Sequence, residues 1–288
     1  DAEYHEKVPP FKPEVYAGRE PGKGDCTVVM EIFTGAECPP CVAADVAFDA
    51  LLKTYKPTEF IGLQYHLHIP GPDPMTNPDT EARGAYYREK FEDVYRVLID
   101  DKVKFYASLG NHDEPDQRKY EHFNMNGNEY YRFVTGGVSF YGLNSNYMDK
   151  RQLDWLESEL VKDSSAWKVA FFHHPPYSSG KQHGSDAELR KVLEPLFVKH
   201  RVNLVLTGHE HFYERIKPQK GIYYFISGAG GKLREGGIKS GSPLTEKAYD
   251  QDLNFMLFEV HGDEAHFQVI TRTGETVDSG VLVRQGST

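Results

Sequence analysis

The sequence predicts an α/β fold in which a substantial part of the sheet structure is antiparallel. Two observations lead to this prediction. Segments with strand and helix patterns alternate in the first part of the chain, and apolar strand segments dominate the last part. A length of 288 residues allows one large domain or two small ones, so both arrangements are open on length alone.

The charge and the hydropathy pattern limit the classes of partner. The formal net charge is −10, from 43 acidic and 33 basic residues, which argues against a general nucleic-acid-binding surface. No apolar run approaches the roughly 18 residues that a membrane helix needs. We therefore expect neither nucleic acid nor a membrane as a partner. The chain opens at Asp1 without a signal peptide, as a mature or a trimmed terminus would.

The N-terminal part is predicted to be an arm followed by a β-α-β unit. Residues 1–25 are rich in Pro, Gly and charge, which is typical of an extended arm. Apolar and β-branched residues predict strands at 27–33 and 59–68, with a helix beginning near Cys38 between them. Strands joined in this way are expected to be parallel, with a right-handed crossover. The four prolines of residues 69–79 predict a loop.

Helices and strands continue to the C-terminus. A helix is expected from about Thr80 to Asp101. Asp149 with Gln152, and Ser185 with Glu188, form two candidate capping boxes, each of which opens a helix. The expected strands lie at 103–110, 129–134 and 138–144 (a hairpin), 167–174, 203–209, 222–228, 254–260, 264–271 and 277–283.

Three polar clusters each follow an apolar strand. They are GNHD at 110–113, HHPP at 173–176 and GHEH at 208–211. Because the carboxyl ends of strands line the ligand crevice of an open α/β sheet, the clusters are expected to meet. Imidazole and amide oxygen suit Zn, Fe or Mn, so a transition-metal site is predicted. The side chains expected to converge are Asn111, His112, His173, His209 and His211.

Each cluster taken alone also has a purely structural explanation. The first could be a turn with an asparagine in a left-handed conformation. The second could be two partly buried imidazoles bonded to the backbone, and the third a surface loop. The recurrence of such clusters after three apolar strands favours the metal site over three independent coincidences.

The three motifs, in this order, closely resemble those of the calcineurin-like metallophosphoesterases. The segments YMDKRQLDWLESEL, YSSGKQHGSD and GHEHFYER are similar to the purple-acid-phosphatase-like branch of that family. The resemblance runs from about Arg88 to the C-terminus. It implies an αββα sandwich, which is two β-layers flanked by helices. It also implies a two-metal site that hydrolyses small phosphate esters.

The resemblance assigns metal ligands by matching positions. Asn111, His173 and His209 would hold the second metal, and His211 the first. His173 is chosen over His174 because the family ligand lies two residues before the first proline. The cofactor implied is one or two ions of Fe, Mn or Zn.

The resemblance also assigns two histidines to the substrate. His112 would face the phosphate and the leaving group, and His183 looks like the substrate-side histidine of these enzymes. Metal ions would activate a water molecule for attack on phosphorus. Either histidine could then protonate the departing alkoxide.

Two motifs of the family are missing upstream. The family has an Asp-x-His at the end of its first strand and a Gly-Asp at the end of its second, with a tyrosine just after it in the purple enzymes. No Asp-x-His precedes residue 110, and the single upstream Gly-Asp, Gly24-Asp25, lies in the arm. The metallophosphoesterase activity is therefore in doubt at the level of the sequence.

A second resemblance occupies the place of these motifs. Residues 26–84 look like a thioredoxin-like strand, C-x-x-C and helix, with Cys38 and Cys41 as the pair. With Cys26 there are too few cysteines for a disulfide framework. A C-x-x-C at a helix N-terminus supports thiol–disulfide exchange. The pair and the family resemblance together lean towards a secreted or periplasmic setting, although the further strands and the cis-proline loop of a thioredoxin are not found.

One hypothesis unites the two resemblances. Residues 26–80 could supply the first two strands and the first helix of one composite sandwich. Because thiolate and imidazole can bind zinc, the strand ends could then offer substitute ligands. Imidazole cannot bridge two ions as a carboxylate can, so such a site could hold a single ion. The substitute ligands would be Cys38, Cys41, His66 and His68.

The predicted organisation is an arm at 1–25, a thioredoxin-like segment at 26–84 and a metallophosphoesterase-like domain at 85–288, with 26–288 as one composite domain in the hypothesis above. The predicted function is metal-dependent hydrolysis of phosphate esters. The alternatives are a thiol–disulfide redox protein that uses Cys38 and Cys41 beside a non-catalytic half, and an inactive chimera.

Overall fold

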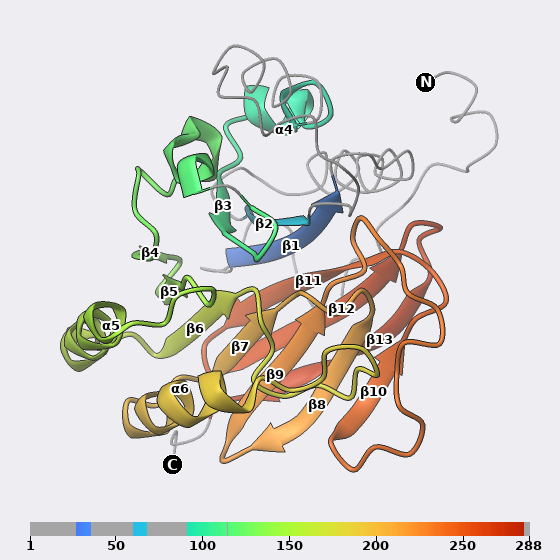
Figure 1. The fold of residues 1–288 in the computed structure, drawn as a ribbon. Coiled ribbons are helices and arrows are strands. Elements are labelled where there is room, and N and C mark those ends of the chain that lie inside the picture. Colours follow the sequence, from blue (N-terminus) through green and yellow to red (C-terminus); the bar gives the residue numbers. More distant parts are fainter. Residues whose placement is uncertain (1–26, 36–59, 68–90, 114, 285–288) are drawn as a thin grey trace.

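The computed structural model describes residues 27–35, 60–67, 91–113 and 115–284, the first two as backbone only (Figure 1). The arm, the helix expected from Cys38 and the loop at 69–79 lie outside these residues. The described strands form two sheets, one of six strands and one of seven.

The six-stranded sheet joins strands from both ends of the chain. β1 pairs in parallel with β2 and β2 with β3, whereas β1 and β11, and β11 to β13, pair antiparallel. The two strands β1 and β2 therefore complete the sheet that the last three strands begin. The order is β13 (Thr276–Val283), β12 (Glu264–Thr271), β11 (Asn254–His261), β1 (Thr27–Gly35), β2 (Phe60–Leu67) and β3 (Phe105–Ser108).

The seven-stranded sheet has a parallel centre and antiparallel edges. The parallel pairs are β5 with β6, β6 with β7, and β7 with β9. The order is β10 (Thr245–Tyr249), β8 (Tyr213–Gln219), β9 (Ile222–Ser227), β7 (Leu204–Thr207), β6 (Trp167–Phe172), β5 (Val138–Gly142) and β4 (Tyr131–Thr135).

The two sheets share one apolar core. The ring of Phe225 on β9 lies 5.7 Å from that of Phe258 on β11 and 5.1 Å from that of Phe267 on β12, measured between centroids. Aromatic pairs at such spacing add to the stabilisation that burial gives. This packing of one sheet on the other, with helices outside, confirms the predicted α/β sandwich.

Two helices cover the outer face of the seven-stranded sheet, α5 (Lys150–Lys162) and α6 (Ala187–Lys199) (Figure 1). Successive side chains of a strand point to opposite faces. On β6, Val169 and Phe171 accordingly belong to the core between the sheets, and Ala170 and Phe172 to the core under the helices. Burial on both faces explains why the central strands are continuous apolar runs.

The helix starts agree with the sequence in one case and differ by one residue in the other. Asp149 caps α5, because its side chain accepts a hydrogen bond of 2.9 Å from the backbone N–H of Gln152. For α6 the predicted cap Ser185 is wrong, since Asp186 accepts from the N–H of Leu189. Ser185 instead accepts a hydrogen bond from the backbone N–H of Ser178 and holds the preceding loop.

The other elements differ from expectation mainly in polar segments. β8 and β10 were not expected, because YERIKPQ and TEKAY carry charges; β10 lies at the sheet edge, where charged side chains remain solvated. Of the helix expected over 80–101, the described part contains α4 (Arg96–Asp100). Two 3₁₀ turns follow β3, at Pro115–Lys119 and Glu121–Phe123.

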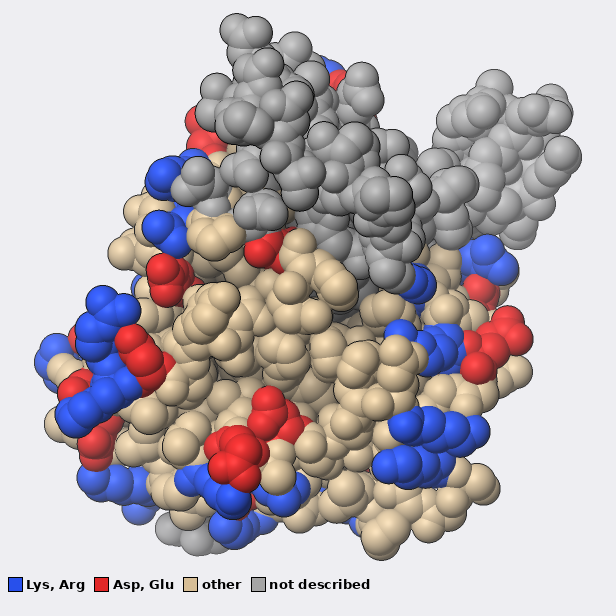
Figure 2. Space-filling model, in the orientation of Figure 1, with Lys and Arg blue, Asp and Glu red and all other residues tan. Residues whose placement is uncertain are grey.

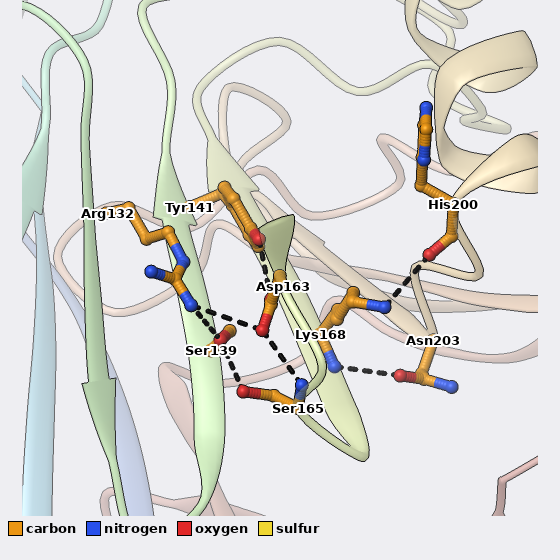
Figure 3. Close-up of polar contacts among 8 residues, drawn as sticks. All are labelled: Arg132, Ser139, Tyr141, Asp163, Ser165, Lys168, His200 and Asn203. Carbon is orange, nitrogen blue, oxygen red and sulfur yellow. Dashed lines mark hydrogen bonds and ion pairs between the residues drawn. The ribbon is translucent and has the colours of Figure 1, made fainter. Parts of the chain in front are cut away.

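Polar contacts tie the amino ends of the central strands together (Figure 3). The Asp163 carboxylate accepts hydrogen bonds from the Tyr141 hydroxyl at 2.6 Å and from the Ser165 N–H at 2.9 Å, and it pairs with Arg132 at 3.1 Å. Its side chain is 1% exposed. Burial acts to raise the pKa of Asp163, but hydrogen bonds from Tyr141 and Ser165 outweigh it and lower the pKa to about 2. The network therefore requires the ionised form.

Replacing Asp163 with Asn is expected to lower the free energy of unfolding at pH 7 by about 2–3 kcal/mol, because buried partners lose their charged acceptor. The pKa is lower in the folded chain than in the unfolded one. The stabilisation is therefore complete above about pH 5 and disappears as the pH falls towards 2. Urea denaturation from pH 7 to pH 3 should show the wild type and the variant converging.

The matched control for this prediction is Asp154→Asn on α5. Asp154 pairs with Lys150 at 2.5 Å, and its side chain is 62% exposed, so a change within about 0.5 kcal/mol is expected. A difference between wild type and Asp163→Asn that stayed constant down to pH 3 would show that the charge of Asp163 contributes nothing.

Candidate metal centre

The carboxyl ends of three strands bring three polar side chains together. Because β6 and β7 are parallel neighbours, with Phe172 opposite Thr207, the residues that follow them are adjacent. The N–H of Gly208 accordingly donates to the carbonyl of His173 at 3.1 Å. The loop after β3 adds Asn111 from the other sheet. The site therefore lies where the two layers meet.

His173 is the centre of this group. Its Nε2 lies 2.8 Å from Asn111 Oδ1 and 2.9 Å from His209 Nδ1. Two ligands that each lie about 2.1 Å from one metal ion are roughly 3 Å apart at a right angle and about 3.4 Å apart at the tetrahedral angle. The spacing of these three atoms therefore fits the ligands of one ion. Their role as metal ligands stays a prediction.

His174 joins the same group, although the motif match favoured His173 alone. One ring nitrogen from each of His173, His174 and His209 lies within 4.8 Å of the others. The ring centroid of His174 is 4.8 Å from that of His173 and 4.6 Å from that of His209. The sequence thus identified one histidine of the pair, whereas the structure brings both to the site.

Burial keeps these imidazoles neutral. It lowers the pKa of His173 well below its ordinary value, and it lowers the pKa of His209 to about 3, in both cases with help from neighbouring histidines. A neutral imidazole presents a lone pair, which is the form that binds a metal. At neutral pH the group is therefore a set of uncharged donors.

A glycine lets His173 reach its position. A Cβ on Gly110 would lie 2.7 Å from Nδ1 of His173, closer than real Cβ contacts come. Hydrogen bonds fix both backbone polar groups of Gly110. Its N–H donates to Asp113 Oδ2 at 2.7 Å, and its carbonyl accepts from Asn146 Nδ2 at 2.8 Å. The GNHD motif therefore needs its glycine for close packing against the histidine.

His211 lies beside this group with an unsatisfied nitrogen. The residue is 9% exposed, and within the described part of the chain its buried Nδ1 has no hydrogen-bond partner. Burial, followed by the charges of Arg234 and Lys232, lowers its pKa to about 3. A buried polar atom without a partner needs an explanation, and a bound ion would provide one. The Nδ1 of His211 is therefore available as a metal ligand.

The side chains predicted to join His211 at a metal ion lie outside those that the structure describes. Cys38, Cys41 and His68 lie outside the described residues. His66 lies in β2, opposite Thr34 of β1, where the backbone alone is described. Their role as substitute ligands stays a prediction.

The two histidines expected to face substrate lie around the group. His112 is exposed, and it lies close enough for its charge to lower the pKa of His173, His209 and His211. The ring centroid of His183 is 4.1 Å from that of His209. Both can therefore reach a ligand bound at the site.

Glu210 positions the His183 loop, a role that sequence reasoning missed. It is fully buried, and its Oε1 accepts hydrogen bonds from the N–H groups of His183 at 3.2 Å and Gly184 at 2.8 Å. Its Oε2 pairs with Arg234 at 3.3 Å. The available signal was the charge of Glu210, since a carboxylate that directly follows a buried strand needs partners.

A fourth strand end also contributes, and it too was missed. The polar run Asn144-Ser145-Asn146 follows β5 as the other clusters follow their strands. Asn146 holds the Gly110 carbonyl, and Ser145 Oγ lies 3.0 Å from Nδ1 of His174. The rule that found the first three clusters would have found this one.

A cavity of about 480 Å³ adjoins the group. Asn111 and His174 line it next to the metal centre, and Arg118 pairs with Glu129 at 3.1 Å in its wall. Further acidic groups in the lining are Asp113 and Asp186.

In the space-filling view the centre of the face shown is largely uncharged, and Lys and Arg gather towards its edges, over α5 and alongside β10 and β13 (Figure 2).

Part of the chain is similar in sequence to known phosphoesterases. Residues 77–213 match the family described as calcineurin-like phosphoesterase. Purple acid phosphatase 18 of Arabidopsis thaliana is 36% identical over 107 residues, which are 34% of this chain and 24% of that protein. Human tartrate-resistant acid phosphatase type 5 is 26% identical over 177 residues, 50% of this chain and 54% of that protein. The chain thus spans from about a quarter to about half of these relatives.

Solved structures share the fold. A structure described as GAP50, the anchor in the inner membrane complex of Plasmodium, has a TM-score of 0.69 at 17% identity and covers 91% of this chain and 90% of its own. Purple acid phosphatase PPD1 from yellow lupin has a TM-score of 0.64 at 14% identity, covering 93% and 55%. None of the described helices is long and apolar enough to cross a membrane. Residues 77–213 thus resemble the calcineurin-like phosphoesterases in sequence, and the chain shares the fold of these solved structures.

Proposed function

We propose that this protein is a metal-dependent hydrolase of small phosphate esters. One observation carries the proposal. Asn111 Oδ1, His173 Nε2 and His209 Nδ1 meet at the ends of three strands, with separations of 2.8 and 2.9 Å about the central nitrogen. Three neutral donors so placed suit a divalent transition metal. The purple acid phosphatases among the relatives support phosphate esters as the substrate class.

The proposed cofactor is one or two ions of Fe, Mn or Zn. When bound, such an ion would lower the pKa of a water molecule and neutralise charge on the phosphoryl oxygens. In this proposal Asn111, His173 and His209 bind one ion, and His211 binds the other. The unsatisfied Nδ1 of His211 supports the second assignment. Cys38, Cys41, His66 and His68 are proposed to replace the missing aspartates there.

Residues around the metals are proposed to handle the substrate. His112 and His183 face the ester, and either can donate a proton to the departing alkoxide, an effect worth about 10² to 10⁴ in rate. Glu210 holds the His183 loop by its backbone, so that the ring stays beside His209. The adjoining cavity is large enough for the alcohol part of a small ester.

The proposed organisation is one composite unit over 26–288. The pairing of β1 with β11, in which Val29 lies opposite Phe258, supports it, since strands from both predicted segments share a sheet. A thioredoxin-like origin of residues 26–84 and a secreted or periplasmic setting rest on the C-x-x-C motif and the family resemblance alone.

The second candidate is a phosphoesterase-like fold without turnover, with or without redox chemistry at Cys38 and Cys41. The absence of Asp-x-His and Gly-Asp upstream of GNHD favours it. The GAP50 structure, described as an anchor, shows that a protein of this fold can be named for a role other than hydrolysis. This candidate predicts no phosphate release whichever metal is supplied.

Metal removal separates the two candidates. Exhaustive chelation is expected to reduce hydrolysis of p-nitrophenyl phosphate to background, because the activated water is lost with the metal, and added Zn, Mn or Fe should restore it. Mass spectrometry of the purified chain should find at least one metal per chain. A metal-loaded chain without turnover would contradict the hydrolase. Insulin reduction that Cys38→Ser abolishes would support the redox protein instead.

A further inference from the structure

His174 is the one member of the histidine group that the motif match leaves without a role. It follows the proposed ligand His173 directly, and its ring packs 4.6 Å from the ring of His209. One of its nitrogens lies within 4.8 Å of a nitrogen of both neighbours. The ring of His174 thus lies against the rings of two proposed metal ligands.

We propose that His174 is a further ligand of the metal that Asn111, His173 and His209 hold. This inference rests on the proposed metal centre and adds a ligand to it. The site would then have three imidazole nitrogens and one amide oxygen, a four-ligand set that suits a zinc-like ion. His174 thus brings the number of ligands of this ion to four.

The contacts of Ser145 prepare His174 for this role. Ser145 Oγ accepts a hydrogen bond of 3.0 Å from the backbone N–H of His174, and it lies 3.0 Å from Nδ1 of the same residue. A protonated Nδ1 can donate to this oxygen, which leaves the lone pair on Nε2. Metal-bound histidines usually donate their other N–H to an oxygen in this way, which fixes tautomer and ring orientation. Ser145 is therefore a positioning residue.

This ligand set has a consequence for the number of ions. A carboxylate can bridge two metals with its two oxygens, whereas a neutral imidazole has one lone pair and binds one ion. With His174 as its fourth ligand, the ion beside His173 would be held independently of any ion at His211. We therefore expect one tight site rather than a coupled pair.

Titration of the chelated full-length chain with Zn²⁺ and Co²⁺ tests the inference. His174→Ala is expected to weaken Zn²⁺ binding at the tight site by more than about 100-fold, because a ligand is lost, and Ser145→Ala by about 10-fold, because only the orientation is lost. The visible absorption of bound Co²⁺ should change in His174→Ala. His174→Gln, which retains an oxygen donor, should lie between Ala and the wild type. His261→Ala, an exposed histidine at the end of β11, should match the wild type.

Two further outcomes separate this inference from the proposed function. If His209→Ala abolishes tight binding while His174→Ala binds like the wild type, His174 is no ligand and the metal centre stands. If the wild type itself binds neither ion tightly, the proposed function fails and this inference with it. Far-UV circular dichroism of each variant shows that a loss of affinity is not a loss of folding.

Discussion

His209→Ala is expected to abolish tight metal binding and phosphate-ester hydrolysis. The change removes the nitrogen that lies 2.9 Å from His173 Nε2, and with it one corner of the donor group. Loss of a supporting hydrogen bond alone commonly weakens metal binding 10–100-fold, so loss of a ligand should cost more than about 100-fold. Turnover should then fall to the background rate at micromolar metal.

The left-handed backbone of His209 allows metal binding and backbone strain to be tested separately. Its φ is 65°, in the left-handed region where a residue with a Cβ is strained by about 1 kcal/mol or more. Strain of this kind persists where the surrounding structure holds it, and it clusters at functional sites. His209→Gly should therefore lose metal binding as His209→Ala does, while the metal-free glycine variant should unfold at higher urea than the alanine variant. Equal unfolding midpoints would show that the strain is not real, and retained metal binding would remove His209 from the site.

Gly228→Ala is expected to destabilise the chain by at least about 3 kcal/mol. An added Cβ would lie 1.9 Å from the backbone carbonyl oxygen of Glu210, and a backbone atom cannot move away by a change of rotamer. That carbonyl also accepts a hydrogen bond of 2.8 Å from Phe212 in the turn that carries both site histidines. The GHEH turn would have to shift, so metal affinity should fall together with stability.

Gly241→Ala is the control for this substitution. Nothing lies within 4 Å of a Cβ there, and its φ of +70° alone opposes the change, which should cost about 1 kcal/mol. Urea denaturation and Zn²⁺ titration of both variants provide the comparison. If the two variants proved equally stable, the close contact between Gly228 and Glu210 would be refuted.

The sequence predicted the fold and the place of the site because both follow from local patterns. Apolar runs identified the central strands, and the polar residues after β3, β6 and β7 identified the crevice. The family resemblance then selected His173 as a metal ligand, which stays a prediction; the structure places its Nε2 between Asn111 and His209. Only a tertiary structure could show that His174 also turns towards His209, because two adjacent residues after a strand can point either to the same place or apart.

The features that the sequence did not predict have physical causes as well. Glu210 stabilises a loop through backbone amides at 183–184, and such partners carry no side-chain signal in a sequence. The start of α6 shifted to Asp186 because Ser185 is engaged with Ser178. β8 was missed because its Glu214 is charged yet fully buried, where it accepts hydrogen bonds from Ser179 and Thr245, and β10 because its charged residues lie at the sheet edge.

Anomalous X-ray diffraction from crystals grown with Zn²⁺ or Mn²⁺, recorded at the absorption edge of the metal, tests the metal centre itself. A strong anomalous peak is expected about 2.0–2.3 Å from Asn111 Oδ1, His173 Nε2 and His209 Nδ1. A map with no peak among these three atoms at saturating metal, or with metal bound only elsewhere, would contradict it.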